Sequence, residues 1–254
     1  KDITVISREE GSGTRDAFTE LTGVLQDDVD KTVDTAEISN STSVVTQSVA
    51  GNDAAIGYIS LGSLDDTVKA VKVDGVEATV DNIKSGDYKI QRPFNIVTKG
   101  EVKELPADFI KFIMSKDGQK IIEDEGYISV NESAEAYKAS GLKGSITLAG
   151  STSVSPVMEV LADKYKELNS GVTIEIQQTG SGAGIQSTTE GVCDIGMASR
   201  ELKDEETSQG LKSEEIALDG IAVIVNKDNG VEDLSMDQIM KIFTGEITNW
   251  ADVK

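Results

Sequence analysis

The stretch GSITLAGSTSVSPVMEVLADKY at residues 144–165 combines the three features that decide the fold class. Ile146 and Leu148 alternate with polar residues as in a strand, a turn of Gly and hydroxyl residues follows at 150–153, and an amphipathic helix comes next. The apolar residues of this helix fall on one face at helical spacing: Val157, Met158, Leu161, Ala162 and Tyr165. The stretch therefore predicts a strand that leads through a polar turn into a helix.

The same order occurs twice more. An apolar strand at residues 3–6 precedes the turn 11–14, and one at 172–176 precedes the turn 180–184. The remaining pattern predicts strands at 55–59, 94–97, 194–198 and 221–225, and helices at 107–124 and 236–243. Strands that alternate with helices predict an α/β fold.

The three turns together predict an anion site. A helix N-terminus offers backbone N–H groups without intrahelical partners and the positive end of the helix dipole. Gly allows the backbone to approach a ligand closely, and Ser or Thr adds hydroxyl donors. The alternative for each turn is that its hydroxyl only caps the helix. An anion site is favoured because all three turns follow apolar strands, whose carboxyl ends are where α/β sheets bind ligands.

Arg8 adds a positive charge at the end of the first strand. Its planar guanidinium could hold two oxygens of a tetrahedral anion. The alternative is a solvated Arg8 paired with Glu9 or Glu10. We expect that Glu10 orients Arg8 and that Arg8 contacts the ligand.

Composition excludes several function classes. The 45 acidic residues outnumber the 24 basic ones and give a net charge of −21, which argues against nucleic-acid partners and anionic membrane surfaces. The sequence has no His, so His-based catalysis and His metal sites are excluded. The single Cys193 lies in an apolar context and is expected to be a core residue rather than a reactive thiol. No metal and no cofactor are expected.

Nucleotide and hydrolase motifs are also missing from the sequence. Ile185 stands where a dinucleotide fingerprint needs its third Gly, and neither a P-loop nor a nucleophile elbow occurs. An enzyme acting on phosphate esters is therefore the disfavoured alternative, and the chain is expected not to be an enzyme. The sequence shows no signal peptide and no apolar run long enough for a membrane span, so a trimmed mature form is expected.

Motifs along nearly the whole chain point to one family: VISREEGSGT at 5–14, AIGYI at 55–59, GQKIIEDEGYI at 118–128, AGSTSVSP at 149–156, QTGSGAGI at 178–185, CDIGMASREL at 193–202, LDGIAVIVN at 218–226 and IFTGEITNW at 242–250. They resemble motifs of the PstS phosphate-binding proteins. The resemblance implies a two-lobed periplasmic-binding-protein-like fold of type II, with a mixed sheet flanked by helices in each lobe. It also implies a protein outside the cytoplasmic membrane, lipid-anchored in its native parent, that binds inorganic phosphate in the cleft between the lobes for the permease of an ABC importer. We expect a monomer, because the lobes must move freely.

The order of these motifs departs from the family. The segment at 149–156 stands first in the family and the one at 118–128 near its end, so the chain is interpreted as an engineered circular permutation. The expected lobes are residues 1–92 with 227–254, and residues 93–226. The expected hinge lies near 91–95 and 224–228.

The resemblance also implies the phosphate contacts: Thr152, Ser153 and Ser181 from one lobe, and Arg8, Ser12, Gly13 and Thr14 from the other. Family members carry an Asp after Gly-x-Ala-Ser that accepts the proton of hydrogen phosphate, but Arg200 stands at that position here. Arg200 is either a second cationic contact or a solvent-facing side chain. Glu10 is the candidate replacement for the missing carboxylate. The alternatives to a phosphate binder are a binder of another oxyanion such as sulfate and an engineered sensor scaffold.

Overall fold

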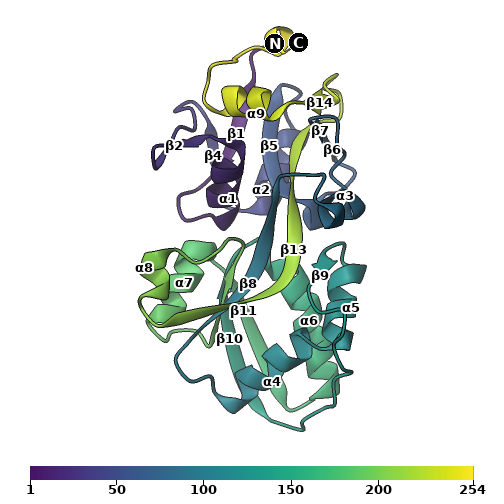
Figure 1. The fold of residues 1–254 in the computed structure, drawn as a ribbon, viewed down its shortest axis with the longest axis vertical. Helices are drawn as coiled ribbons and strands as arrows, with labels where there is room; N and C mark the ends of the chain where they lie inside the picture. The colour runs from purple at the N-terminus through teal and green to yellow at the C-terminus, as the bar shows by residue number, and fades with distance from the viewer. Residues whose placement is uncertain (254) are drawn as a thin grey trace. The chain divides into compact units, whose positions relative to one another are not determined.

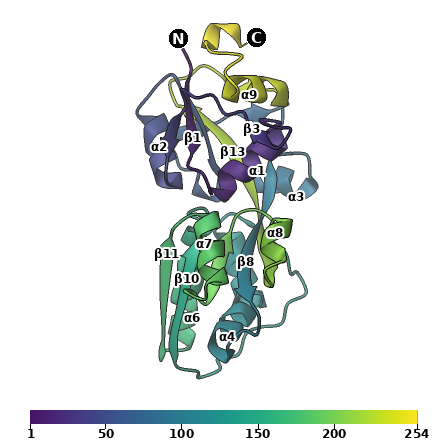
Figure 2. The same ribbon diagram turned by 90° about the vertical axis from the view of Figure 1, so that its left-hand side faces the viewer.

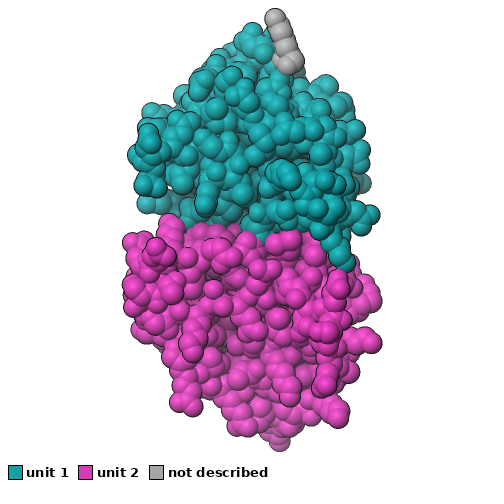
Figure 3. All heavy atoms as spheres, viewed as in Figure 1, with its two compact units in different colours: residues 1–92, 219–254 teal, residues 93–218 magenta. Residues whose placement is uncertain are grey.

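The chain forms two compact units, coloured separately in Figure 3. The computed structural model describes residues 1–253. Unit 1 contains Lys1–Arg92 and Asp219–Lys254, and unit 2 contains Pro93–Leu218. Each unit combines a mixed sheet with helices on its faces (Figure 1), so the predicted α/β, two-lobed fold class is confirmed.

Two strands carry the chain from one unit to the other. They are β8 (Gln91–Lys99) and β13 (Leu211–Asn226). The second change of unit falls at Leu218/Asp219, whereas the sequence placed a hinge connection near 224–228. The difference arises because β13 is one continuous strand of 16 residues, so no loop marks the change of unit.

The sheet of unit 1 is mixed. β1 pairs in parallel with both its neighbours, and β13 is antiparallel to β5 and β6. The strands of this unit besides β13 are β1 (Thr4–Arg8), β4 (Glu37–Ser39), β5 (Ala55–Ser60) and β6 (Val68–Ala70), with two small pairs, β2 (Leu25–Gln26) with β3 (Val29–Asp30) and β7 (Lys72–Val73) with β14 (Asp233–Leu234). β1 is thus a central strand, and its carboxyl end carries Arg8.

Helices cover both faces of this sheet. They are α1 (Gly13–Thr22), α2 (Thr42–Ala50), α3 (Val80–Ser85) and α9 (Met236–Phe243), with the short turns η1 (Leu61–Ser63) and η2 (Trp250–Asp252). On β5, Tyr58 stacks on Phe18 of α1 at a centroid distance of 3.9 Å. The neighbouring Gly57 faces Val45 and Val49 of α2. Because successive strand residues point to opposite faces, α1 and α2 lie on opposite sides of the sheet.

The first and last described segments of the chain lie side by side in unit 1 (Figure 1). The Ile3 N–H donates to the Thr248 carbonyl at 2.8 Å, and the Trp250 N–H donates to the Lys1 carbonyl at 2.9 Å. Asp2 and Asn249 form an antiparallel bridge between these bonds. The segments 1–3 and 248–250 therefore form a short antiparallel pair.

The sheet of unit 2 is also mixed. β10 (Gly144–Gly150) pairs in parallel with β11 (Val172–Gln178) and β12 (Ile195–Ala198), and β12 is antiparallel to β8. β9 (Ile128–Ser129) pairs with the first half of β13. The helices of this unit are α4 (Glu104–Ile113), α5 (Lys116–Asp124), α6 (Ser155–Leu168), α7 (Ser181–Thr189) and α8 (Asp204–Thr207). Figure 2 shows α7 beside β10.

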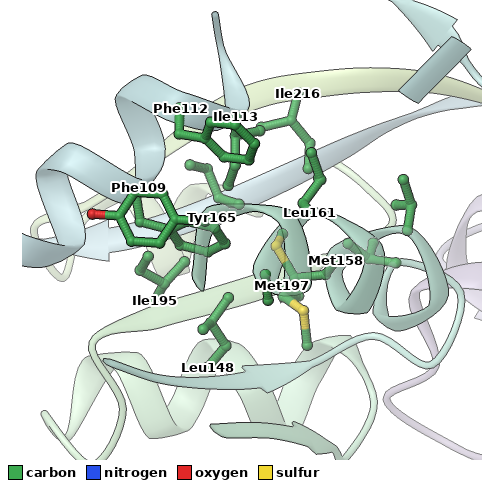
Figure 4. Packing of buried hydrophobic residues seen from close by; sticks show 14 of the residues in the cluster. Phe109, Phe112, Ile113, Leu148, Met158, Leu161, Tyr165, Ile195, Met197 and Ile216 are labelled. Atoms are coloured by element: carbon green, nitrogen blue, oxygen red, sulfur yellow. The ribbon is translucent and has the colours of Figure 1, made fainter. Parts of the chain in front are cut away.

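The main core of unit 2 lies between the sheet and the helices α4, α5 and α6. Phe109, Phe112 and Tyr165 cluster there, with Leu148 and Met197 contributed by the sheet (Figure 4). Gly196, between Ile195 and Met197 on β12, instead faces Thr188 of α7. This core and α7 therefore cover opposite faces of the sheet.

The predicted single helix at 107–124 is wrong, because two helices occupy this segment. α4 ends before Met114, and Ser115 starts α5 by accepting a hydrogen bond from the Gly118 N–H at 3.2 Å. A Cβ on Gly118 would lie 2.3 Å from the Phe112 carbonyl oxygen, so glycine allows the two helices to meet closely. By contrast, the helix predicted at 236–243 is confirmed as α9.

None of the helices within residues 1–253 is both long enough and apolar enough to cross a membrane. In the same residues, no group of three or more acidic or Cys side chains is arranged to hold a metal ion.

Candidate functional site

In unit 1, the turn after β1 leads directly into the N-terminus of α1. Gly11 has φ of +85°, a left-handed conformation that favours glycine. Ser12 is the N-cap of α1 and accepts a hydrogen bond from the Arg15 N–H at 3.3 Å. The capping interpretation is therefore confirmed for Ser12. Gly13 and Thr14 begin the helix, so their backbone N–H groups belong to the set that has no acceptor one turn earlier.

Arg8 is held at the carboxyl end of β1 by a neighbouring carboxylate. Its side chain is 2% exposed, its Nε donates to Glu9 Oε2 at 2.7 Å and its Nη2 donates to Glu9 Oε1 at 2.8 Å. Glu9, not Glu10, is therefore the carboxylate that orients Arg8, and the assignment of that role to Glu10 is corrected. Glu10 is an exposed residue. This arrangement fixes a guanidinium at the carboxyl end of β1, four residues before the N-cap of α1.

A second cation supports the same turn. The Arg15 Nη1 donates to the Arg8 carbonyl at 2.7 Å, and the Arg15 Nε donates to Asp30 Oδ2 at 2.7 Å. Burial tends to raise the pKa of Asp30, but hydrogen bonds from Thr32 and Arg15 outweigh it and lower that pKa. Arg15 thus ties the backbone of the turn to the β3 strand.

A buried ion pair contacts the side chain of Thr14. Arg92 and Asp219 have side chains only 2% and 1% exposed, and the Arg92 Nε and Nη2 both donate to Asp219 Oδ2, at 3.1 and 3.0 Å. Ser60 donates to the other Asp219 oxygen at 2.9 Å, and the Arg92 Nη1 donates to the Thr14 hydroxyl at 2.7 Å. Burial raises the pKa of Asp219 to about 6, although the charge of Arg92 opposes this shift.

In unit 2, the turn after β10 is built on Ser151. Gly150 has φ of +143°, and the Ser151 N–H donates to the Met197 carbonyl at 2.9 Å. The Ser151 hydroxyl accepts hydrogen bonds from the N–H groups of Ser153 and Val154, at 3.2 and 3.3 Å. Ser151 therefore satisfies the first amides of the α6 entry, which is the capping role considered as the alternative for this turn.

The second turn of unit 2 joins the first through hydroxyl groups. Ser181, the first residue of α7, accepts a hydrogen bond from the Ser199 N–H at 3.1 Å, and the two hydroxyls are 3.3 Å apart. The Ser151 hydroxyl donates to the Ser199 hydroxyl at 3.0 Å. Ser199 thus links the starts of α6 and α7. The predicted contacts Thr152, Ser153 and Ser181 are all buried.

Arg200 follows Ser199, and its side chain forms an ion pair with Glu206. Its Nη1 and Nη2 donate to the two carboxylate oxygens of Glu206, each at 2.8 Å, and its Nη1 also donates to the Glu201 carbonyl at 2.8 Å. Burial tends to raise the pKa of Glu206, but the hydrogen bond from Arg200 outweighs it and lowers that pKa. Because Arg200 is 7% exposed, the solvent-facing alternative is wrong.

Sequence reasoning missed Arg92, Asp219 and Ser199. A usable signal existed for Asp219, since a carboxylate inside the apolar run LDGIAVIVN must find a cation or several donors if the strand is buried. Nothing in the sequence indicated that the cation would be Arg92, which is 127 positions away.

Comparisons with known proteins place these features in a family. A family model described as a PBP superfamily domain matches residues 1–117 and 133–254. A phosphate-binding protein PstS 2 of Streptococcus agalactiae is 53% identical over 257 residues, which cover 99% of this chain and 87% of that protein. The solved structure of a phosphate-binding protein of a phosphate ABC transporter from Streptococcus pneumoniae is 49% identical, covers 100% of both chains and has a TM-score of 0.80.

A phosphate-binding protein PstS of Bacillus subtilis matches only part of the chain. It is 38% identical over 112 residues, which cover 43% of this chain and 37% of that protein. The similarity to the streptococcal proteins thus runs through nearly the whole chain, whereas the similarity to the Bacillus protein stops within it.

Proposed function

This chain belongs to the PBP superfamily and, within it, to the PstS-type phosphate-binding proteins, and on that premise we propose that it captures inorganic phosphate as the substrate-binding component of an ABC importer. The observation that carries the proposal is the buried Arg8, four residues before the N-cap of α1. A fixed guanidinium can hold two oxygens of a phosphate, and the amides of the helix N-terminus can hold a third.

The proposed contacts keep the residues that the sequence indicated. In unit 1 they are the guanidinium of Arg8, the hydroxyls of Ser12 and Thr14 and the backbone of Gly13; in unit 2 they are Thr152, Ser153 and Ser181. The buried position of these hydroxyls supports their role, because a phosphate that leaves water must receive hydrogen bonds from buried protein donors in place of those from water.

The chain is proposed to bind phosphate without turning it over, as a solute-binding protein that works outside the cytoplasmic membrane. A lipid anchor of the native parent and a monomeric state stay predictions. Closure of a cleft between the lobes also stays a prediction, and small-angle X-ray scattering with and without phosphate tests it.

Calorimetric titration of phosphate into protein freed of bound ligand tests the function. We expect saturable binding of micromolar strength or tighter, about −8 kcal/mol or more favourable. Arg8→Ala should abolish detectable binding, whereas Lys120→Ala, which removes an exposed cation paired with Asp124, should leave it unchanged. Wild-type protein that folds and does not bind phosphate would refute the proposal.

Selectivity against sulfate is a separate proposal. Phosphate carries a proton near neutral pH and sulfate does not, so discrimination requires an acceptor at the site. Glu10 stays the proposed acceptor, since Glu9 is occupied by Arg8. Titration with sulfate decides: no response supports an acceptor, and equal binding of both anions would reduce the assignment to a general tetrahedral oxyanion. Glu10→Gln should weaken phosphate binding and leave any sulfate binding unchanged.

We also propose that the motif order is a circular permutation relative to proteins such as the Bacillus relative. The contrast in coverage supports it: one alignment spans 99% of this chain with the streptococcal protein and 43% with the Bacillus protein. The alignment with the streptococcal protein covers 99% of this chain. This coverage favours a natural origin of the permutation over the engineered origin expected from the sequence. A rearranged gene that joins segments 248–250 and 1–3 by a short loop and opens before Gly144 should give a folded phosphate binder.

A further inference from the structure

We propose that Arg92 is a positioning residue for phosphate binding, which acts by directing the hydroxyl proton of Thr14 toward the ligand. The inference rests on the proposed function, because it takes Thr14 as a phosphate contact. It concerns only unit 1, which contains Arg92, Asp219 and Thr14.

The direction of the Thr14 hydroxyl follows from the chemistry of its partner. A guanidinium is only a donor, whereas a hydroxyl has one proton and two acceptor lone pairs. Since the Arg92 Nη1 lies 2.7 Å from Thr14 Oγ1, the hydroxyl must accept there, and its own proton points away from Arg92. The proton of Thr14 is therefore left for an acceptor other than Arg92, and the proposal takes that acceptor to be the bound phosphate.

The position of Arg92 is in turn set by Asp219. The Nε and Nη2 edge of the guanidinium faces Asp219 Oδ2, which leaves Nη1 aimed at Thr14. Asp219 is itself fixed, because Oδ1 accepts from the Ser60 hydroxyl at 2.9 Å. A chain of charge-assisted hydrogen bonds therefore runs from Ser60 through Asp219 and Arg92 to Thr14, with both charged side chains almost fully buried.

The positions of Arg92 and Asp219 in the chain suggest why a buried ion pair occurs at this point of unit 1. Arg92 is the last residue of the first segment of unit 1, and Asp219 is the first residue of the second segment. The pair thus joins the two strands β8 and β13 at the points where they leave and enter this unit. An apolar pair could hold the strands together equally well, but it could not donate a hydrogen bond to Thr14.

A double-mutant cycle with calorimetric titration of inorganic phosphate tests the proposal. The variants are Arg92→Lys, Thr14→Val and the two combined. Lysine keeps the charge but has a single nitrogen, so it cannot hold Asp219 by a fork and reach Thr14 together. We expect each single variant to weaken phosphate binding by about tenfold or more, and the combined variant to bind no more weakly than Thr14→Val.

Tyr88→Phe is the matched control. The Tyr88 hydroxyl donates to the Ile221 carbonyl at 2.7 Å, a buried hydrogen bond to the same strand as Asp219. Its loss should lower the melting temperature and leave the phosphate affinity unchanged. Affinity losses that track melting temperature across all variants, the control included, would show a merely structural role and overturn the proposal.

The outcomes separate this proposal from the proposed function. Wild-type protein that binds no phosphate overturns the function. Wild-type protein that binds phosphate, with Arg92→Lys unchanged or with the two effects additive, overturns the positioning role alone. Where Arg92→Lys does not fold, a crystal structure of the wild-type phosphate complex decides: Thr14 Oγ1 within hydrogen-bonding distance of both Arg92 and a phosphate oxygen supports the proposal, and loss of either contact overturns it.

Discussion

Gly184→Ala should destabilise the protein, although alanine normally stabilises a helix. Gly184 lies inside α7, where replacing glycine by alanine favours the helix by about 1 kcal/mol. Here, however, a Cβ would lie 2.4 Å from the Ala149 carbonyl oxygen and 2.4 Å from the Gly150 Cα. Both atoms belong to the backbone of β10, so no side chain can move aside. Glycine at this position is what allows α7 to lie against the strand.

The magnitude follows from the overlap. Ordinary contact begins at 3.4 Å, so helix and strand must separate by about 1 Å (3.4 − 2.4). Overpacking of this kind costs about 1–3 kcal/mol, which outweighs the helix preference and leaves a net loss of about 1–2 kcal/mol. Ser181 lies one turn earlier and accepts from the Ser199 N–H at 3.1 Å. A displacement of about 1 Å would break that bond and weaken phosphate binding about tenfold.

Chemical denaturation and calorimetric titration of the same samples provide the test. Ala183→Gly is the control, because it lies in the same helix at an exposed position and should cost about 1 kcal/mol by helix preference alone, with no change in affinity. A Gly184→Ala protein that is more stable than wild type by about 1 kcal/mol, with unchanged phosphate affinity, would refute the reasoning about close helix–strand approach.

Three further predictions concern charge and burial. The pKa of Asp219 is raised from 3.8 to about 6, so this group stabilises the folded state below pH 4 and loses that contribution as the pH rises to 6. The difference in unfolding free energy between wild type and Asp219→Asn should therefore fall by about 3 kcal/mol across this window and stay constant above it. Denaturation at several pH values measures this difference. Arg92→Met at pH 7.5 should cost about 3–5 kcal/mol in urea unfolding, because it leaves the Asp219 carboxylate buried without its cation, and a cost below about 1 kcal/mol would show that the pair is solvated. Burial raises the pKa of the Cys193 thiol, so a disulfide reagent should label it only after denaturation, and rapid labelling of native protein would contradict its core position.

Much of the fold was predictable because it depends on local pattern. The strands that precede the polar turns and the helix at 236–243 are visible as periodicity in the chain, and the apolar residues of that pattern form the cores. The break between α4 and α5 was not, because Ile110, Ile113 and Ile121 continue one helical pattern across a turn that only the Ser115 cap and the approach at Gly118 explain.

For the candidate site, the sequence by itself determined which turns could receive an anion, since Gly, Ser and Thr at the start of a helix are local features. Only the tertiary structure decided which charges serve those turns. Arg8 pairs with Glu9 rather than Glu10, Arg200 pairs with Glu206, and Arg92 pairs with Asp219, which is 127 positions away. Which partner a charged side chain pairs with depends on distances in space and on the free-energy cost of burying a charge without a partner. Neither can be derived from the order of residues along the chain.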